Sequence, residues 1–226
     1  LPLPGAHLLG ALACAAIVWA SIQALRQVRL KMLVAYSTVA QIGYLVLALA
    51  VFSVGDAPLS AWTGGFYFLA SHAFAKSAMF LAAGNFLYAA GHDRIEDLPA
   101  SLGAVPTSMV AFALGGISIV GLPPSGGFLG KWLLLNGALD VSGIFVVVIL
   151  LGGLLAAAYV LRVINAGFVE TRLDPATRKV PRLMEWSALA AGAVAILLGV
   201  LSALPIDLLS VGAPGDGPLL RSGMAP

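Results

Sequence analysis

The chain has 226 residues, of which 60% are hydrophobic and 10% charged, and its formal net charge is +2. Soluble domains carry about 25% charged residues. This chain therefore has too little polar surface for a water-soluble globule, and too much apolar surface for a disordered segment. The 12 Lys and Arg residues are scattered instead of forming a basic stripe, which argues against nucleic-acid binding. A single cysteine, Cys14, excludes an internal disulfide and a cysteine-rich metal site.

Six stretches are apolar enough to cross a membrane. A crossing needs about 20 apolar residues, and an open sheet edge cannot lie in lipid. We therefore expect an all-α integral membrane protein with six transmembrane helices. The six stretches cover about 7–25, 32–53, 61–90, 105–135, 142–166 and 184–204. Residues 205–226 are rich in Pro, Gly and Leu and are predicted to form an external tail, as a loop or a short surface helix. The initial Leu suggests a piece of a longer protein.

The connections between these stretches differ in basic residues. In chain order the five connections hold 3, 0, 1, 0 and 4 Lys or Arg residues. Basic connections tend to stay in the cytoplasm. We therefore expect the first, third and fifth connections inside and both ends of this chain outside, in a bacterial-type plasma (inner) membrane.

The third stretch carries a histidine and a lysine near its middle. His72 and Lys76 are four residues apart, so they share one face of a helix. A charged side chain at the bilayer centre costs at least about 2.5–3.5 kcal/mol, and a lysine in a low-dielectric environment gives up its proton more easily. The pair is therefore a candidate proton relay. The alternative is that Lys76 reaches an interface and His72 bonds a carbonyl.

The fourth stretch contains a strong helix breaker directly before a lysine. Pro123 and Pro124 remove two backbone donors, and Gly126 and Gly127 follow. We expect a discontinuous helix, broken near 122–127, with the positive N-terminal end of its second half close to Lys131. Lys131 is then a candidate relay residue. The alternative is a plain loop between two short re-entrant helices, with Lys131 at the external surface.

A third lysine begins the second stretch. Lys31 lies at the predicted cytoplasmic edge, where a topology-setting charge and a proton-uptake residue are both plausible. The sequence has no haem-type histidine pair, cysteine cluster or dinucleotide glycine fingerprint. We therefore expect no catalytic residues, no metal site and no cofactor in this chain.

Three segments together resemble one family. They are RLKMLVAYSTVAQIGY at 29–44, SHAFAKSAMFLAAG at 71–84 and GLPPSGGFLGK at 121–131. Their order and spacing are similar to those of the proton-conducting, antiporter-like membrane subunits of respiratory complex I, Mrp-type cation/proton antiporters and membrane-bound hydrogenases. The resemblance covers about residues 5–205, and it corresponds to the C-terminal half of such subunits.

The resemblance implies a specific architecture and role. It implies a five-helix antiporter-like repeat with a discontinuous helix, plus one final helix. His72 and Lys76 match the midplane relay, and Lys131 matches the lysine of the broken helix. The first repeat and the long lateral helix of the largest complex I subunit are absent from these residues. The implied partners are other membrane subunits, the lipid bilayer, H⁺ and possibly Na⁺.

The predicted function is proton, or cation/proton, translocation within a larger respiratory or antiporter complex, through a second half-channel. The chain is not expected to be an enzyme by itself, but a subunit of an NADH-quinone oxidoreductase-like, hydrogenase or Mrp-type complex. One alternative is a non-conducting structural or assembly subunit. Another is a small secondary carrier that acts as a dimer.

Overall fold

The computed structural model describes residues 3–54, 58–99, 103, 105–167, 169 and 177–210. Within these residues the chain is helical, and the one β-type contact is an isolated bridge between Arg29 and Arg94. The elements are α1 (Leu3–Arg26), α2 (Leu30–Val54), α3 (Pro58–Ala90), η1 (Ile95–Asp97), α5 (Pro106–Val120), α6 (Gly126–Leu139), α7 (Gly143–Ala166), α8 (Arg182–Val200) and α9 (Ala203–Ser210). An all-helical chain is the expected result for a backbone that must satisfy its own hydrogen bonds in lipid.

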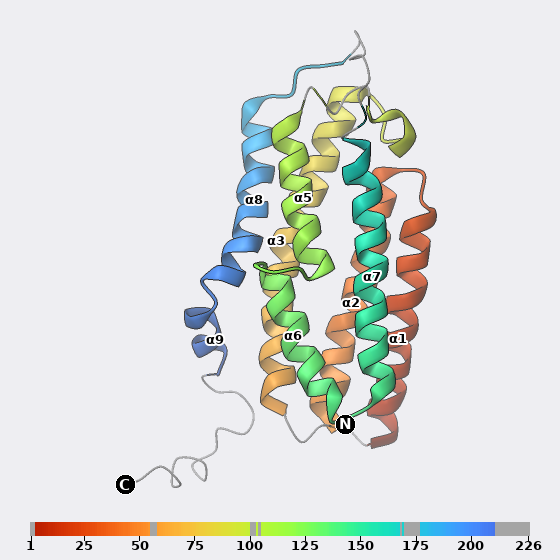
Figure 1. Ribbon diagram of the computed structural model, residues 1–226, viewed down its shortest axis with the longest axis vertical. Helices are drawn as coiled ribbons and strands as arrows, with labels where there is room; N and C mark the ends of the chain where they lie inside the picture. The colour runs from red at the N-terminus through yellow and green to blue at the C-terminus, as the bar shows by residue number, and fades with distance from the viewer. Residues whose placement is uncertain are drawn as a thin grey trace.

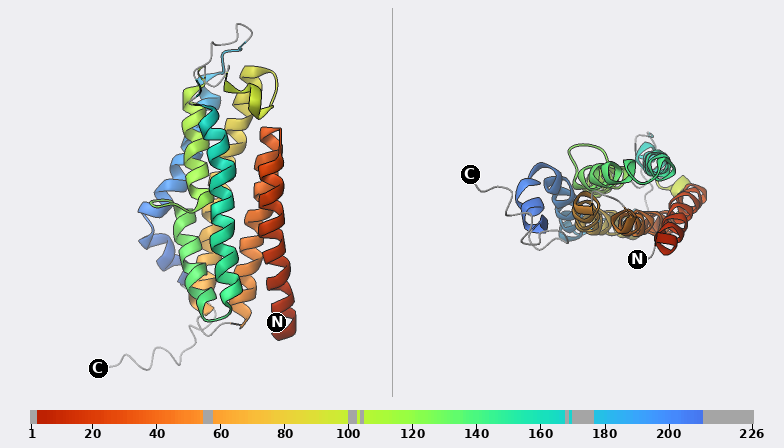
Figure 2. Two further views of the ribbon diagram at one scale, coloured as in Figure 1. Left: turned by 45° about the vertical axis from the view of Figure 1, so that its right-hand side comes forward. Right: turned by 90° about the horizontal axis from the view of Figure 1, so that it is seen from below.

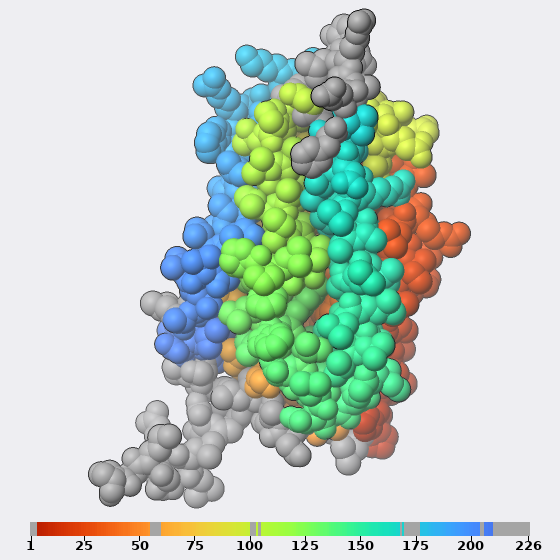
Figure 3. Space-filling view, viewed as in Figure 1, coloured from red at the N-terminus to blue at the C-terminus, as the bar shows by residue number. Residues whose placement is uncertain are grey.

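The long helices run side by side along the long axis of the molecule (Figure 1). Seen along that axis, α1, α2 and α3 form one row, and α5, α6 and α7 form a second row against it (Figure 2). α3 is the central element, because it packs against α2, α5, α6 and α8. The side chains of α5, α6 and α7 cover one face of the bundle (Figure 3).

Four described helices are long and apolar enough to cross a membrane. They are Pro4–Arg26, Leu30–Val54, Gly143–Ala166 and Arg182–Val200. The 33-residue helix α3 is not among them, because its buried histidine, lysine and asparagine lower its hydropathy. At 1.5 Å per residue, α3 is about 50 Å long and exceeds the roughly 30 Å of a hydrocarbon core.

Residues 105–135 form two helices that meet end to end (Figure 1). α5 ends at Val120, and Gly121 caps it in the left-handed conformation at φ 88° with its N–H bonded to Ile117 O. α6 begins after Ser125, whose hydroxyl accepts the N–H of Phe128 at 3.2 Å. The two prolines lie between these caps, where neither has to supply a helical N–H.

The chain also differs from expectation near its C-terminal end. The sixth apolar stretch was predicted to continue to residue 204, but α8 ends at Val200 and the separate helix α9 follows. Residues 211–226 of the predicted external tail lie outside the described residues. The basic residue Arg172 of the fifth connection also lies outside them.

A polar cluster fixes the beginning of α5 against α3 and α8. The amide of Asn85 donates to Ser108 Oγ at 2.9 Å and to Met184 O at 3.0 Å. The Glu185 carboxylate accepts from the backbone N–H of Ser108 at 3.3 Å. A negative group at a helix N-terminus is favourable, because the first N–H groups have no intrahelical acceptor. This cluster holds the three helices in register.

Candidate functional site

Lys131 is buried at the junction of α5 and α6. Only 7% of the residue is exposed. Its Nζ donates to Ile119 O at 2.7 Å and to Val120 O at 3.3 Å. These carbonyls belong to the last turn of α5, where the helix itself supplies no partner. The ammonium group thus contacts the negative end of α5, whereas the sequence suggested that the positive end of α6 would dominate its surroundings.

Two aromatic rings complete the surroundings of Lys131. Nζ lies 4.4 Å from the ring centroid of Tyr44 on α2 and 5.8 Å from that of Phe68 on α3. An ammonium over a ring face is attracted by about 0.5–2 kcal/mol. The Tyr44 hydroxyl is committed elsewhere, since it donates to Ile149 O of α7 at 3.0 Å. Lys131 is therefore held by carbonyls and ring faces.

Lys76 is buried between α3 and α2, with 6% exposure. Its Nζ donates to Val34 O at 3.1 Å and also to Ser37 Oγ. The Ser37 hydroxyl in turn donates to Val34 O at 2.9 Å. Both acceptors are neutral oxygens of α2, so this second ammonium also has no carboxylate among its hydrogen-bond partners.

His72 lies one turn before Lys76 on α3. It is 8% exposed, and its ring stacks on Phe68 with centroids 6.0 Å apart. Its Nδ1 atom is buried without a hydrogen-bond partner among the described residues. The structure thus places His72 and Lys131 beside the Phe68 ring, and Lys76 is buried one turn beyond His72 on α3.

The buried group contains positive charge without a nearby carboxylate. The ion pairs of the described residues, Arg29–Asp93 at 3.8 Å and Arg94–Asp97 at 3.3 Å, lie in the connections at one end of the bundle. The described residues also contain no group of three or more His, Cys, Asp or Glu that could hold a metal ion. The chemistry available inside the bundle is that of titratable nitrogens and hydroxyls.

Glycines at the start of α6 allow the close approach that buries Lys131. A Cβ atom on Gly127 would overlap the backbone carbonyl of Ser118 on α5. A Cβ on Gly126 would lie 2.9 Å from the hydroxyl of Ser71 on α3, and that hydroxyl shares a 2.9 Å hydrogen bond with Ser118. The break is therefore packed tightly on its inner side, while Pro123 and Pro124 are exposed.

Lys31 lies apart from this group. It is half-buried in the first turn of α2, six residues before Ser37, which corresponds to about 9 Å along a helix. No hydrogen bond or ion pair joins it to the three central residues among the contacts that the structure describes. Its position at the end of the bundle fits both roles that the sequence left open.

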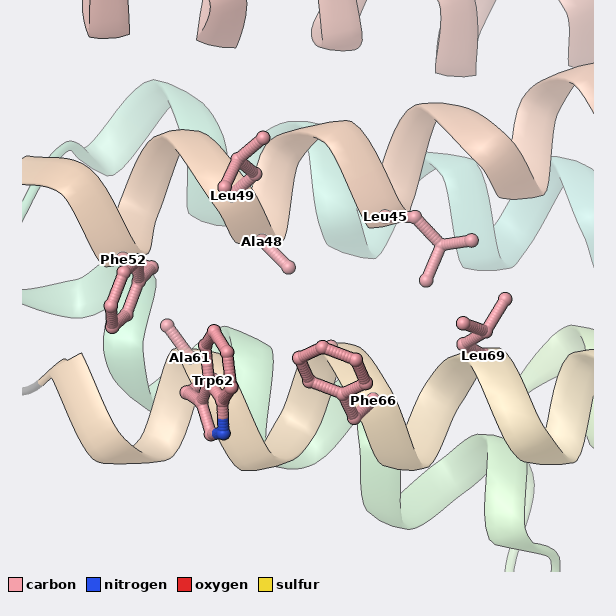
Figure 4. A pocket seen from close by; sticks show the side chains of 9 residues that line it. Leu45, Ala48, Leu49, Phe52, Ala61, Trp62, Phe66 and Leu69 are labelled. Atoms are coloured by element: carbon pink, nitrogen blue, oxygen red, sulfur yellow. The ribbon is translucent and has the colours of Figure 1, made fainter. Parts of the chain in front are cut away.

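A groove of about 220 Å³ between α2 and α3 is unsuited to ion chemistry. Side chains from both helices point toward one another across it, and all are apolar apart from the Trp62 indole nitrogen (Figure 4). They are Leu45, Ala48, Leu49, Phe52, Ala61, Trp62, Gly65, Phe66 and Leu69. Such a surface suits contact with lipid or another apolar helix.

Comparison with known proteins gives the family. Residues 5–156 match the family described as NADH:quinone oxidoreductase/Mrp antiporter, TM. The chain belongs to this family. It is a membrane-embedded, multi-pass protein, and ion or proton transport is the function with which the family is associated.

Relatives and solved structures of the antiporter family agree with this assignment. NADH-quinone oxidoreductase subunit N of Desulforudis audaxviator (strain MP104C) is 37% identical over 176 residues, which are 77% of this chain and 34% of that protein. Respiratory complex I from Thermus thermophilus with bound NADH contains a chain of the same fold, with a TM-score of 0.79, 24% identity and coverage of 91% of this chain and 44% of that one.

The Mrp complex from Dietzia sp. DQ12-45-1b also contains this fold, with a TM-score of 0.78 and 22% identity over 92% of this chain and 46% of that one. The chain thus spans about a third of the length of the curated relative and less than half of each structural neighbour. The same fold therefore occurs in a chain of a respiratory complex and in a chain of an Mrp complex.

Sequence reasoning did not single out the partners of the buried lysines. The acceptors of Lys131 are backbone carbonyls, which any residue could supply, so no sequence signal identifies them. Ser37 belongs to one of the three antiporter-family segments, but its contact with Lys76 joins residues 39 positions apart. The sequence signal that could have identified Ser37 is the helical spacing of small polar residues within an apolar stretch.

Proposed function

We propose that this chain is the part of a proton-translocating membrane subunit that carries a half-channel, with His72, Lys76 and Lys131 as its proton relay. The observation that carries the proposal is the burial of two ammonium groups, 6% and 7% exposed, whose described hydrogen-bond acceptors are all neutral. The parent assembly is a respiratory or Mrp-type complex, in which other membrane subunits supply the driving force.

The neutral acceptors favour a proton carrier over a structural charge. A lysine held by a buried carboxylate would leave an uncompensated negative charge when it lost its proton, at a cost of several kcal/mol. A lysine held by carbonyls, a hydroxyl and ring faces leaves no charge behind. The unpartnered Nδ1 of His72 is a further buried site able to take up a proton.

The proposed arrangement in the membrane has six spans. α1, α2, α3, α7 and α8 are five of them, and α5 with α6 is the sixth, a discontinuous span of the antiporter-like repeat. Carbonyls freed at such a break are tolerated beside protein or a wet cavity. We assign Lys131 to the exchange of protons with a hydrated exit beside Pro123, Pro124, Gly126 and Gly127.

The proposed orientation follows from the basic connections. The ends of α1, α3 and α7 and the beginnings of α2 and α8 lie at one end of the bundle (Figure 1). Placing this end in the cytoplasm puts both ends of the chain outside a bacterial-type inner membrane. Lys31 then lies at the cytoplasmic edge and is the proposed uptake residue. H⁺ is the proposed ion, with Na⁺ exchange as an outcome to be measured.

The test uses the full-length protein assembled with its partner subunits in membrane vesicles. Lys76→Ala and Lys131→Ala are each expected to abolish the coupled pH gradient, measured with a ΔpH-sensitive dye, while the complex still assembles. Lys179→Ala is the control, because that lysine is exposed in the connection before α8. Wild-type proton movement in both interior variants would instead assign the chain a non-conducting assembly role. Purification as a homodimer without other subunits would favour a small carrier.

A further inference from the structure

Three fully buried polar side chains lie close to Lys76 on α2 and α7. Ser37 and Gln41 lie one turn apart on α2, and Tyr159 faces them from α7. The Gln41 amide nitrogen donates to the Tyr159 hydroxyl at 3.5 Å, and Ser37 lies one turn before Gln41 on the buried side of α2. Lys76 contacts the same serine. The four residues therefore form one buried polar cluster across three helices, with the Lys76–Ser37 and Gln41–Tyr159 hydrogen bonds one turn of α2 apart.

Ser37 differs in kind from the other acceptor of Lys76. The carbonyl of Val34 can accept a hydrogen bond but has no proton to pass on. A serine hydroxyl both accepts and donates, and it rotates freely between partners. Of the two acceptors described for Lys76, Ser37 is the one through which a proton can leave.

The far end of this cluster has unused hydrogen-bonding capacity. Gln41 Oε1 and Ser21 Oγ are buried without a partner among the described residues. Ser21 lies one turn along α1 from Ile17, which packs on Gly43 of α2, so Ser21 lies at the level of Gln41. Buried polar atoms of this kind commonly bind an internal water, which needs two to four polar partners.

We propose that Ser37 and Tyr159 are relay residues that exchange protons between Lys76 and a water molecule bound by Gln41 and Ser21. In one transfer an N–H bond of the Lys76 ammonium breaks and Ser37 Oγ gains that proton. The Ser37 hydroxyl gives its own proton to the Tyr159 oxygen, and the phenolic proton passes to the water. Lys76 ends as a neutral amine, the water as hydronium, and Ser37 and Tyr159 are restored as neutral hydroxyls. This inference rests on the proposed relay function of Lys76.

The test measures initial rates of proton translocation by the full-length protein in membrane vesicles. Tyr159→Phe removes one oxygen and keeps the ring, and Ser37→Ala removes the hydroxyl that joins it to Lys76. A positioned proton donor contributes about 10²–10⁴-fold to a rate, so each change is expected to lower translocation at least about tenfold. Because both residues act in one linear transfer, the double variant is expected to be no slower than the slower single variant.

Two matched controls separate proton transfer from packing. Tyr67→Phe removes the hydroxyl of another buried tyrosine, which donates to the Leu198 carbonyl. Thr38→Ala removes a hydroxyl that donates to the Val34 carbonyl at 3.0 Å. Both controls are expected to keep translocation within about twofold of the wild type, since neither hydroxyl passes a proton onward.

Each outcome decides the inference. The inference is supported if Tyr159→Phe and Ser37→Ala each lower the translocation rate and the double variant is no slower than the slower single variant. Additive losses, or rates like those of the two controls, overturn it while Lys76→Ala remains inactive and the proposed function stands. If Lys76→Ala itself translocates protons, the proposed function fails first. If Tyr159→Phe does not accumulate in the membrane, the translocation rates of Ser37→Ala and Thr38→Ala are compared instead. A slower rate in Ser37→Ala alone supports the inference, and equal rates overturn it.

Discussion

The two buried lysines are stabilised in different ways. Lys131 binds the carbonyls of Ile119 and Val120, which are free because α5 ends there, and it lies over the Tyr44 ring. Lys76 lies beside the uninterrupted helix α2, where its acceptors are the Val34 carbonyl and the Ser37 hydroxyl.

The difference shows two ways of burying an ammonium group without a carboxylate. A helix break supplies several backbone acceptors at one place, at the cost of two caps and a linker that must pack tightly. A continuous helix has no free carbonyls in its middle, so a side-chain hydroxyl supplements an acceptor already used within the helix. The site at the break is therefore built from backbone, and the other site depends on one serine.

The largest expected effect comes from arginine at the two lysine positions. Arginine keeps the charge but cannot be deprotonated in proteins. Lys131→Arg is expected to assemble normally, because two carbonyls and a ring face also suit a guanidinium, yet to lower proton translocation at least about 10²-fold. Lys76→Arg is expected to lose translocation equally and also to accumulate less, because the Val34 carbonyl at its site already accepts hydrogen bonds from Ser37 and Thr38. Membrane immunoblots and ΔpH-dye assays measure both effects, and a translocating Lys131→Arg variant would refute the relay role.

Filling the break is expected to have the next largest effect. Gly127→Ala would force the new methyl group against the Ser118 carbonyl and push α6 away from α5. Overpacking of this kind costs about 1–3 kcal/mol, and it moves Lys131 from its acceptors. Thermal unfolding of the full-length protein in detergent measures the loss. The control is Gly84→Ala, where a Cβ has open space and a gain of up to about 1 kcal/mol is expected from helix propensity.

A smaller effect is expected from the ring beneath Lys131. Tyr44→Leu removes a cation–π contact of about 0.5–2 kcal/mol, which corresponds to roughly two- to thirtyfold in an equilibrium constant. We expect the rate of proton translocation to decrease by a factor in that range. Tyr44→Phe keeps the ring and loses only the bond to Ile149 O, so its translocation should exceed that of Tyr44→Leu. Equal rates in the two variants would show that the ring contact is unimportant.

The smallest effect is expected in the apolar groove between α2 and α3. Phe66 is 43% exposed and contacts Trp62, at a ring-centroid distance of 4.6 Å, in a groove that neither buried lysine lines. Phe66→Ala is expected to leave the translocation rate within about twofold of the wild type, because the lost contact of about 0.5–1.5 kcal/mol touches neither lysine. A loss as large as that of Tyr44→Leu would show that the groove takes part in transport.

Much of the candidate site could be predicted because it depends on local spacing. His72 and Lys76 share a helix face because they are four residues apart, and the two prolines cannot continue a helix. The charge at Lys131 stood out because so few charges interrupt the apolar stretches. The local electrostatics could not be predicted, because they required knowing that the C-terminal end of α5, and not the beginning of α6, faces the Lys131 ammonium.

Helix lengths, the apolar character of the chain and its family motifs are properties of neighbouring residues. The amino-acid order alone was therefore sufficient for the membrane fold class, and it singled out the three residues that we propose as the relay. The hydrogen bonds of the lysines, the Gln41–Tyr159 hydrogen bond and the anchoring of α5 by Glu185 join residues from 11 to 118 positions apart. Only the packing of separate helices brings such groups within hydrogen-bond distance, because a hydrogen bond depends on positions in space to a few tenths of an ångström.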